Sequence, residues 1–596
     1  MKKNNLYDNL IIHIVCIWGT LIGLMFTQNE IPMDNWFIEA SADGLFGNSN
    51  TGLMVLCGNF MLTAIIWILS KTGLRVFWLH VLMVIFQYIG TYLVCKIVKQ
   101  KVKKRIWICI MIVYNVLLIP YLYSTMCFTI TASYVIACGL AWIMYCKDTN
   151  LKKSNYIIGF ICLIMGISFR WDCVLFGGAF CAGAVAVNVI TQLFDKKRRK
   201  KILEILNSLV PYIISFSILV VIVVVQFGCL NYFESGFDKW NSIRTKVDDY
   251  EIPIYEDATK EYLDIGVSEN DYALLKSWNN YDPEFYTSNL YSDIIKMKKN
   301  DISNKTDFIN EAKIVLYNFF DNVFCQIAVL IFIIALLMRN RSAIFHTLSI
   351  IIVYIFLLIY FQSIGRLIYR IEFSMYVALA VMLMYVLIMD GVLEKLVEQN
   401  KIKYFFFVCV FSIIIMPVLE GNGIYNNFRG KSIIDIYTDM NNKEDTYGRY
   451  ILNKINSTTK YSGGVTMNNG LAEKILADKE NFYFFLFCDN WKQVYPLTDR
   501  DIFRTAKVGT ASNMGVLGLY FPKLSVMRNN FKNYNVTNPF ESLTDDNVFV
   551  VVRKNEADSR TNEIEMYLEE HYDMGVKFSI VEEIEDVVVG KYTKEK

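Results

Sequence analysis

Long apolar runs separated by short polar segments dominate the hydropathy pattern of this chain. About twelve runs approach the roughly 20 residues that an α-helix needs to cross a bilayer. They lie at 9–26, 51–70, 76–98, 106–123, 127–146, 156–169, 173–194, 205–229, 323–338, 344–361, 371–390 and 404–420. With 54% hydrophobic residues, this pattern predicts an α-helical polytopic membrane protein of about 11–12 transmembrane segments.

The polar segments divide the chain into four predicted parts. A membrane module at 1–229 contains an acidic outer loop at 28–50, and a helical insert follows at 230–320. A second membrane module of four helices at 321–420 precedes a soluble domain at 421–596. Short β-rich runs at 482–487, 547–552, 577–583 and 586–592 alternate with helical patterns in this last part. We therefore expect a C-terminal extracytoplasmic α/β domain that folds on its own.

Two local signals indicate that the insert is folded. Ser268 followed by Asp271 is a variant of the capping box that starts a helix, and Ser288 precedes a second helical pattern. Asp282 and Pro283 between them are typical of a turn. We expect a hairpin-like cap of two helices.

Charge predicts the orientation in the membrane. Lys2 and Lys3 precede the first run, the loop at 28–50 contains no Lys or Arg, and the basic block at 195–201 is the strongest cytoplasmic marker. These features place the N-terminus in the cytoplasm of a plasma-membrane protein and the C-terminal domain outside. Six runs lie between the outer loop and the basic block. Segments on opposite sides of the membrane must be connected by an odd number of crossings, so one of the six runs does not cross. By length, the short run 156–169 is the one that does not cross. By charge, it is a run within 51–98, and the sequence leaves both alternatives open.

Composition excludes several classes of function. No basic block suggests nucleic acid, and no glycine-rich phosphate loop accompanies the short inner loops, which argues against a cytoplasmic nucleotide-sugar enzyme. Almost all of the 14 cysteines lie in or beside apolar runs, where they act as small hydrophobic residues. The four histidines are scattered without a metal-binding spacing.

Charged residues on the predicted outer face are the candidates for chemistry. Asp34 follows the first helix closely enough to act as a general base on an acceptor hydroxyl. The arginines are suited to a phosphate or diphosphate leaving group, which a guanidinium binds through two hydrogen bonds. The candidate catalytic residue is Asp34, and the candidate substrate-binding residues are Glu39, Arg170, Asp172, Arg366 and Arg370. This set predicts glycosyl transfer from a lipid-phosphate-linked sugar.

Structural roles are the alternative for every candidate. Asp34 would cap a short interfacial helix or stand in solvent, and Glu39 would be solvated. Arg170 and Asp172 would form a local pair at a helix break. Arg366 and Arg370 would anchor a short loop by extending to the membrane surface.

The architecture resembles the GT-C superfamily of polytopic membrane glycosyltransferases. The matching positions are Asp34 in IPMDNWFIEA, for the acid of the first outer loop, and more loosely GISFRWD at 166–172. The paired acids usual in that loop are Asp34-Asn35 here, and no WWDYG-like signature is present. The resemblance implies a polyprenyl-phosphate sugar donor, an envelope glycan or protein acceptor, membrane lipids as partners, and a divalent metal ion as the one cofactor to consider.

Two other classes of function remain open. A transporter or flippase usually buries charged residues near mid-membrane, and the centres of the clear runs lack them apart from the break at 170–172. A non-catalytic scaffold of envelope polysaccharide assembly would use its outer domain for binding.

Overall fold

The computed structural model divides the chain into two compact units. The helical unit comprises Met1–Pro32, Leu79–Val225 and Asp307–Gly463, and the mixed unit comprises Met33–Trp78, Gln226–Thr306 and Gly464–Lys596. The structure describes residues 2–25, 33–43, 45–46, 60–72, 74, 76–102, 105–123, 126–194, 202–248, 252–302, 323–363, 369–398, 468–486, 494, 511–518 and 524–595.

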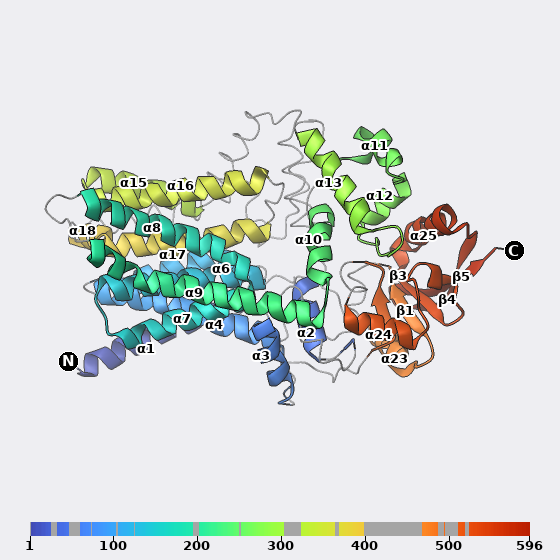
Figure 1. The fold of residues 1–596 in the computed structure, drawn as a ribbon. Coiled ribbons are helices and arrows are strands. Elements are labelled where there is room, and N and C mark those ends of the chain that lie inside the picture. The colour runs from blue at the N-terminus through green and yellow to red at the C-terminus, as the bar shows by residue number, and fades with distance from the viewer. Residues whose placement is uncertain are drawn as a thin grey trace. The chain divides into compact units, whose positions relative to one another are not determined.

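The helical unit is built from long apolar helices that run side by side (Figure 1). They are α1 (Lys2–Met25), α4 (Trp78–Lys101), α5 (Ile106–Tyr123), α6 (Phe128–Asp148), α7 (Tyr156–Phe169), α8 (Val174–Phe194), α9 (Ile202–Phe233), α15 (Val323–Leu337), α16 (Arg341–Ser363), α17 (Tyr369–Met389) and α18 (Val392–Glu398). Short 3₁₀ turns η2 (Lys153–Asn155) and η3 (Trp171–Cys173) flank α7. Within the described residues, α1, α4, α6, α8, α9, α16 and α17 are long and apolar enough to cross a membrane. The predicted run 404–420 lies outside the described residues.

Helix α6 forms the core of the helical unit. Every residue from Phe128 to Cys146 is buried, and α7, α8 and α17 pack around it. Glycine permits close contact between these helices: a Cβ at Gly166 of α7 would lie 3.1 Å from the backbone nitrogen of Ile136 and 3.2 Å from the carbonyl oxygen of Ala132. Small residues at such contacts let two apolar helices approach closely inside a membrane.

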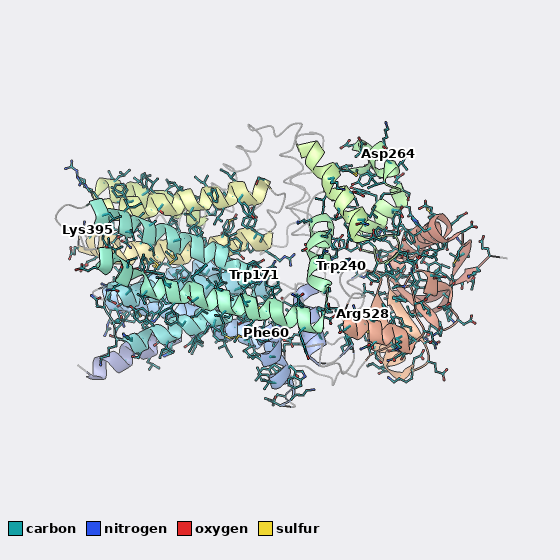
Figure 2. The ribbon with its side chains drawn as sticks, viewed as in Figure 1. Phe60, Trp171, Trp240, Asp264, Lys395 and Arg528 are labelled. Atoms are coloured by element: carbon teal, nitrogen blue, oxygen red, sulfur yellow. The ribbon has the colours of Figure 1, made fainter. Side chains whose placement is uncertain are left out.

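Polar contacts define two opposite ends of the helical unit. At one end, Lys99 at the end of α4 pairs with Asp8 in α1 at 3.4 Å, and the Tyr385 hydroxyl donates to Asp148 at 2.6 Å. At the other end, Arg170 donates to Thr129 at the start of α6. Figure 2 shows Lys395 and Trp171 at these two ends. The helices between them therefore run from end to end in alternating directions.

The mixed unit combines three stretches of sequence. Its helices are α2 (Met33–Asp43), α3 (Phe60–Ser70), α10 (Phe237–Asp248), α11 (Thr259–Asp264), α12 (Glu269–Lys276), α13 (Ser288–Ile302), α23 (Asn469–Ala477), α24 (Ser525–Asn533) and α25 (Ala557–Tyr572), with 3₁₀ turns η4 (Tyr255–Asp257), η8 (Glu541–Thr544) and η9 (Lys554–Glu556). The predicted capping box is confirmed, because Ser268 and Asp271 exchange side-chain and backbone hydrogen bonds at the start of α12.

A five-stranded sheet confirms the predicted C-terminal α/β domain. Its strands are β1 (Phe482–Phe485), β2 (Met514–Val516), β3 (Val548–Arg553), β4 (Val576–Ile584) and β5 (Val587–Lys594), in the order β2-β1-β3-β5-β4. β1 is parallel to β2 and β3, whereas β5 is antiparallel to β3 and β4. Strands β1 and β3 are apolar and buried, as expected for the centre of a covered sheet.

This sheet shares its compact unit with earlier parts of the chain. The Ala511 N–H donates to the Leu45 carbonyl at 2.6 Å, and the Asn530 side chain donates to the Phe46 carbonyl at 2.7 Å. The buried Glu234 carboxylate accepts the Ser525 N–H and hydroxyl at the start of α24. The C-terminal region therefore contacts both the first loop and the insert, although the sequence had suggested a separate domain.

Candidate functional site

Arg170 is held where helix α7 ends. Its backbone is extended (φ −162°, ψ 113°), which breaks the helix and directs the side chain across the start of α6. Its Nε donates to Asp172 Oδ1 at 2.8 Å and Oδ2 at 3.1 Å, and Nη1 donates to Thr129 Oγ1 at 3.1 Å. The guanidinium also lies 5.9 Å from the centre of the Phe128 ring. The predicted Arg170–Asp172 pair is therefore present and anchored to α6.

The Thr129 carbonyl also binds the first turns of α17, where a second arginine, Arg370, lies. The Thr129 carbonyl accepts from Cys173 Sγ and from Ser374 Oγ, each at 3.4 Å. Ser374 lies one turn after Arg370 on α17, and the positive charge of Arg370 acts on Arg170. Glu372, in the same turn, is 1% exposed. We call Arg170, Asp172, Arg370 and Glu372, with Thr129 between them, the arginine cluster.

Aromatic rings adjoin the arginine cluster on α17. Tyr121 of α5 lies 5.4 Å from Phe373 and 5.5 Å from Tyr376, measured between ring centres. The same ring lies 5.2 Å from Phe324 at the start of α15. These contacts connect the first turns of α17 to the faces of α5 and α15.

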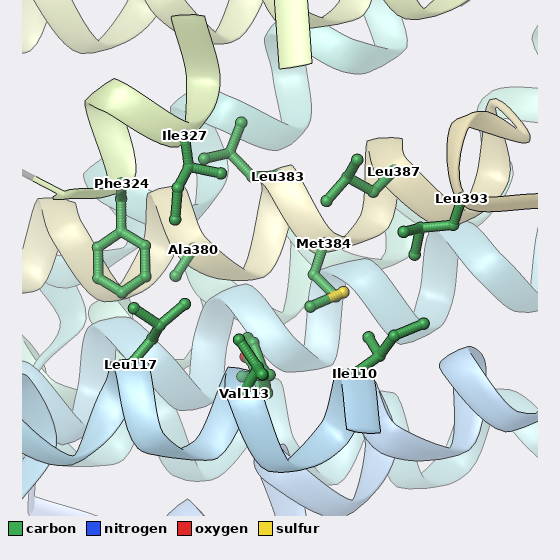
Figure 3. A pocket seen from close by; sticks show the side chains of 11 residues that line it. Ile110, Val113, Leu117, Phe324, Ile327, Ala380, Leu383, Met384, Leu387 and Leu393 are labelled. Carbon is green, nitrogen blue, oxygen red and sulfur yellow. The ribbon is translucent and has the colours of Figure 1, made fainter. Parts of the chain in front are cut away.

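Phe324 also lines an apolar groove between α5, α15, α17 and α18 (Figure 3). The space between its side chains is small, about 40 Å³ against roughly 300–1,000 Å³ for ligand pockets, so the groove has room for only a segment of a hydrocarbon chain. Apart from the Tyr114 hydroxyl, the lining side chains are hydrocarbon or thioether. They are Ile110, Val113, Tyr114, Leu117, Phe324, Ile327, Ala380, Leu383, Met384, Leu387 and Leu393. Such a wall suits a hydrocarbon chain.

The remaining candidates lie in the mixed unit or outside the described residues. Asp34 belongs to the first turn of α2, as the predicted short helix required, but its side chain lies outside the described part. Glu39 is fully buried, so the alternative of a solvated side chain was wrong, and its contact with a substrate stays a prediction. Arg366 lies outside the described residues.

The structure thus brings together three of the six sequence candidates, Arg170, Asp172 and Arg370. Sequence reasoning missed Thr129 and the apolar groove. Thr129 lies inside an apolar run and carries no distinctive motif. The groove is formed by helices that are far apart in the sequence, so only their packing reveals it.

The helices and the sheet define a polytopic α-helical membrane protein with a C-terminal α/β domain. No protein-family model and no curated protein matches the chain. Among solved structures, it is similar to the archaeal oligosaccharyltransferase AglB from Archaeoglobus fulgidus in complex with an inhibitory peptide and a dolichol-phosphate. The TM-score is 0.42 and the identity 12%, covering 99% of this chain and 75% of that chain.

Proposed function

We propose that this chain transfers a sugar from a polyprenyl-phosphate donor to a cell-envelope acceptor on the outer face of the plasma membrane. The observation that carries the proposal is the arginine cluster, in which Arg170 and the first turns of α17, which contain Arg370, both lie beside Thr129. Phosphate leaving as a sugar is transferred gains negative charge, which preorganised guanidinium groups stabilise. Asp172 would act as a positioning residue, because it holds Arg170 through its Nε.

The apolar groove supports a donor with a long hydrocarbon tail. From the groove, Phe324, Tyr121 and Phe373 form a continuous chain of ring contacts toward the first turn of α17, where Arg370 lies. A polyprenyl chain would bury a segment of its hydrocarbon in the groove, while its phosphate would lie at the arginine cluster. Residues in two separate environments would therefore recognise the two chemical parts of the donor.

The acceptor side of the proposal rests on Asp34. Asp34 lies in the first turn of α2, the short helix that follows α1 in the sequence. We propose that Asp34 removes the proton of the acceptor hydroxyl as the bond to the sugar forms. A divalent ion bound near this loop acid is the cofactor to test.

The helical unit also supports a membrane topology. Asp8 lies near the start of α1 and Lys99 near the end of α4, and their ion pair requires both on one side of the membrane. Asp8 and Lys99 lie on the same side if α1 and α4 each cross the membrane and α3, which lies between them in the sequence, does not. Within the described residues, the 11 residues of α3 extend about 16 Å, against a core of roughly 30 Å. We propose that 51–70 is the run that does not span the membrane, in agreement with the charge pattern.

The two ends of the unit then fall on opposite sides. Lys99, Lys147 and Lys395 would lie in the cytoplasm, and the arginine cluster outside. The insert and the C-terminal region would share the outer side, because Asp271 of α12 pairs with His571 of α25.

A transfer assay with the purified chain and polyprenyl-phosphate sugars tests the proposal. Arg370→Gln should lower the rate by roughly 10²-fold or more, and Arg170→Lys should lower it less than Arg170→Gln because one charge is kept. Lys395→Gln, at the opposite end of the helical unit, is the matched control and should leave the rate unchanged.

Asp34→Asn keeps the size of the side chain but removes the base, so it should also lower transfer by roughly 10²-fold or more. Equal rates for Asp34→Asn and the wild type would reject the base assignment. No transfer by the wild type with any donor would reject the proposed function and favour lipid handling or a scaffold.

A further inference from the structure

Three potential metal ligands meet where the insert contacts the C-terminal region within the mixed unit. Asp271 lies on α12, and Glu570 and His571 are neighbours on α25. One ligand atom from each lies within 4.8 Å of the other two. His571 Nε2 is 2.7 Å from Asp271 Oδ1. Such a group is found nowhere else in the part of the chain that the structure describes.

The first ligand is fixed by the start of α12. Asp271 is fully buried, and its Oδ2 accepts the Ser268 N–H at 2.9 Å. Its own N–H donates to Ser268 Oγ at 3.0 Å. The same Ser268 hydroxyl donates to Glu570 Oε2 at 2.9 Å, so one serine orients both carboxylates. Oδ1 of Asp271 remains directed at the imidazole.

The imidazole is fixed by aromatic rings. The His571 ring centre lies 4.0 Å from that of Phe285 and 4.5 Å from that of Tyr567. Metal sites commonly use such surrounding contacts to hold their ligands in the required orientation. Glu570 is exposed, which gives an ion from solution access to the cluster.

We propose that Asp271, Glu570 and His571 bind a zinc ion. Zinc accepts both imidazole nitrogen and carboxylate oxygen as ligands, and three protein ligands leave its fourth position to water. The nitrogen ligand favours zinc over magnesium or calcium, which prefer sites made of oxygen alone. The two carboxylates balance the double charge of the ion. Zinc would replace the hydrogen bond between His571 and Asp271 and join α12 to α25.

This site is independent of the proposed glycosyl transfer. It contains none of the arginine cluster, and its ligands come from polar segments on either side of the second membrane module. Its expected effect is on stability, because an ion that binds only the folded state stabilises that state by mass action. The proposal is therefore tested by metal content and unfolding temperature and does not depend on a transfer assay.

The experiment uses the full chain, purified in detergent without a polyhistidine tag, treated with a chelator and then dialysed against zinc chloride. Elemental analysis should find about one zinc ion per wild-type chain, and zinc should raise the unfolding temperature of the mixed unit. Glu570→Gln should weaken zinc binding at least tenfold, and His571→Gln should abolish it. Glu569→Gln, an exposed neighbour on α25, is the matched control and should bind as the wild type does.

Glu570 is exposed, so its substitution should leave the fold intact even if His571→Gln does not fold. Absence of zinc from the wild type would overturn the proposal. Equal zinc content in the wild type and Glu570→Gln would overturn it as well, since the ion would then be bound elsewhere. Equal binding of magnesium and zinc would reject the assignment of the metal.

Discussion

A buried carboxylate should control how firmly the insert and the C-terminal region are joined within the mixed unit. Asp282 is 1% exposed and lies in the predicted Asp-Pro turn, which the structure confirms. It accepts hydrogen bonds from the Tyr567 hydroxyl at 2.9 Å, the Tyr572 hydroxyl at 2.5 Å, Asn538 Nδ2 at 3.1 Å and the Glu284 N–H at 2.8 Å. We expect Asp282→Ala to open this junction.

The free energy lost in Asp282→Ala follows from the hydrogen-bond acceptor that each donor to Asp282 loses. Tyr567 is fully buried, and burial, Tyr286 and Asp282 all raise its pKa, so its hydroxyl stays protonated and needs an acceptor. Tyr572 is half-buried and can reach water, and Asn538 keeps the Tyr572 hydroxyl as a partner. A buried donor without an acceptor costs about 1–3 kcal/mol, and the lost charge-assisted bonds add to this. We expect a total of roughly 2–4 kcal/mol.

Hydrogen exchange at the amides of α25 measures this local opening without unfolding the membrane helices. Since 1.4 kcal/mol is a factor of ten, exchange should accelerate by roughly 30- to 700-fold in Asp282→Ala. Asp264→Ala, an exposed acid at the end of α11, is the control and should change exchange little.

A double substitution tests the reasoning. Tyr567→Phe removes the donor that Asp282→Ala leaves unsatisfied, so the double variant should be no less stable than Asp282→Ala alone. Simple addition of the two single losses would refute the explanation, because it would mean that the hydroxyl and the carboxylate act independently.

Two further predictions concern topology and pH. Thr72→Cys, after α3, should react with an impermeant maleimide in intact cells well above the parent chain, whereas protection until the cells are opened would show that α3 crosses the membrane. Burial acts to raise the pKa of Asp478, but hydrogen bonds from Tyr483, Asn481 and two backbone N–H groups outweigh it and hold the pKa below its ordinary value. The resulting stability is present above the unfolded pKa of about 3.9 and is lost as pH falls through the lower folded value. Asp478→Asn should therefore destabilise the mixed unit by roughly 1 kcal/mol at pH 7 and by less below about pH 4 in thermal unfolding, and a constant difference would contradict the assignment.

Local signals in the sequence predicted local structure well. The Ser268–Asp271 capping box marked the start of α12, an aromatic run located β1, and runs rich in β-branched residues located β3, β4 and β5. Strand β2 was missed because its three residues, Met514–Val516, are too few to show a periodic pattern. These successes share a cause, since each signal and its structural effect lie within a few residues of each other.

Contacts between distant residues could not be predicted in this way. His571 and Asp271 are 300 positions apart in the sequence. Metal-binding motifs are recognised by ligands a few residues apart, so no spacing of the histidines could indicate this pair. The carboxylates beside His571 and at α12 looked like ordinary surface charges of amphipathic helices. Only the packing of α12 against α25 makes them neighbours, and it also explains why the C-terminal region and the insert form one unit.

The parity of the membrane crossings sets length against charge as the criterion for the run that does not cross. Length pointed to the 14-residue helix α7 as the run that fails to cross, yet α7 follows α6 from one end to the other. Trp142 Nε1 donates to the Asn155 carbonyl just before α7 begins, and Arg170 just after it contacts Thr129 at the opposite end of α6. A Cβ at Gly159 would lie 3.1 Å from a carbonyl oxygen of α6, so the two backbones touch between these ends. A short helix can thus extend as far through the unit as its longer neighbour when its flanking turns complete the distance. We therefore expect a crossing to be distinguished by the partners that its two ends contact, and by that measure we expect α7 to cross with α6.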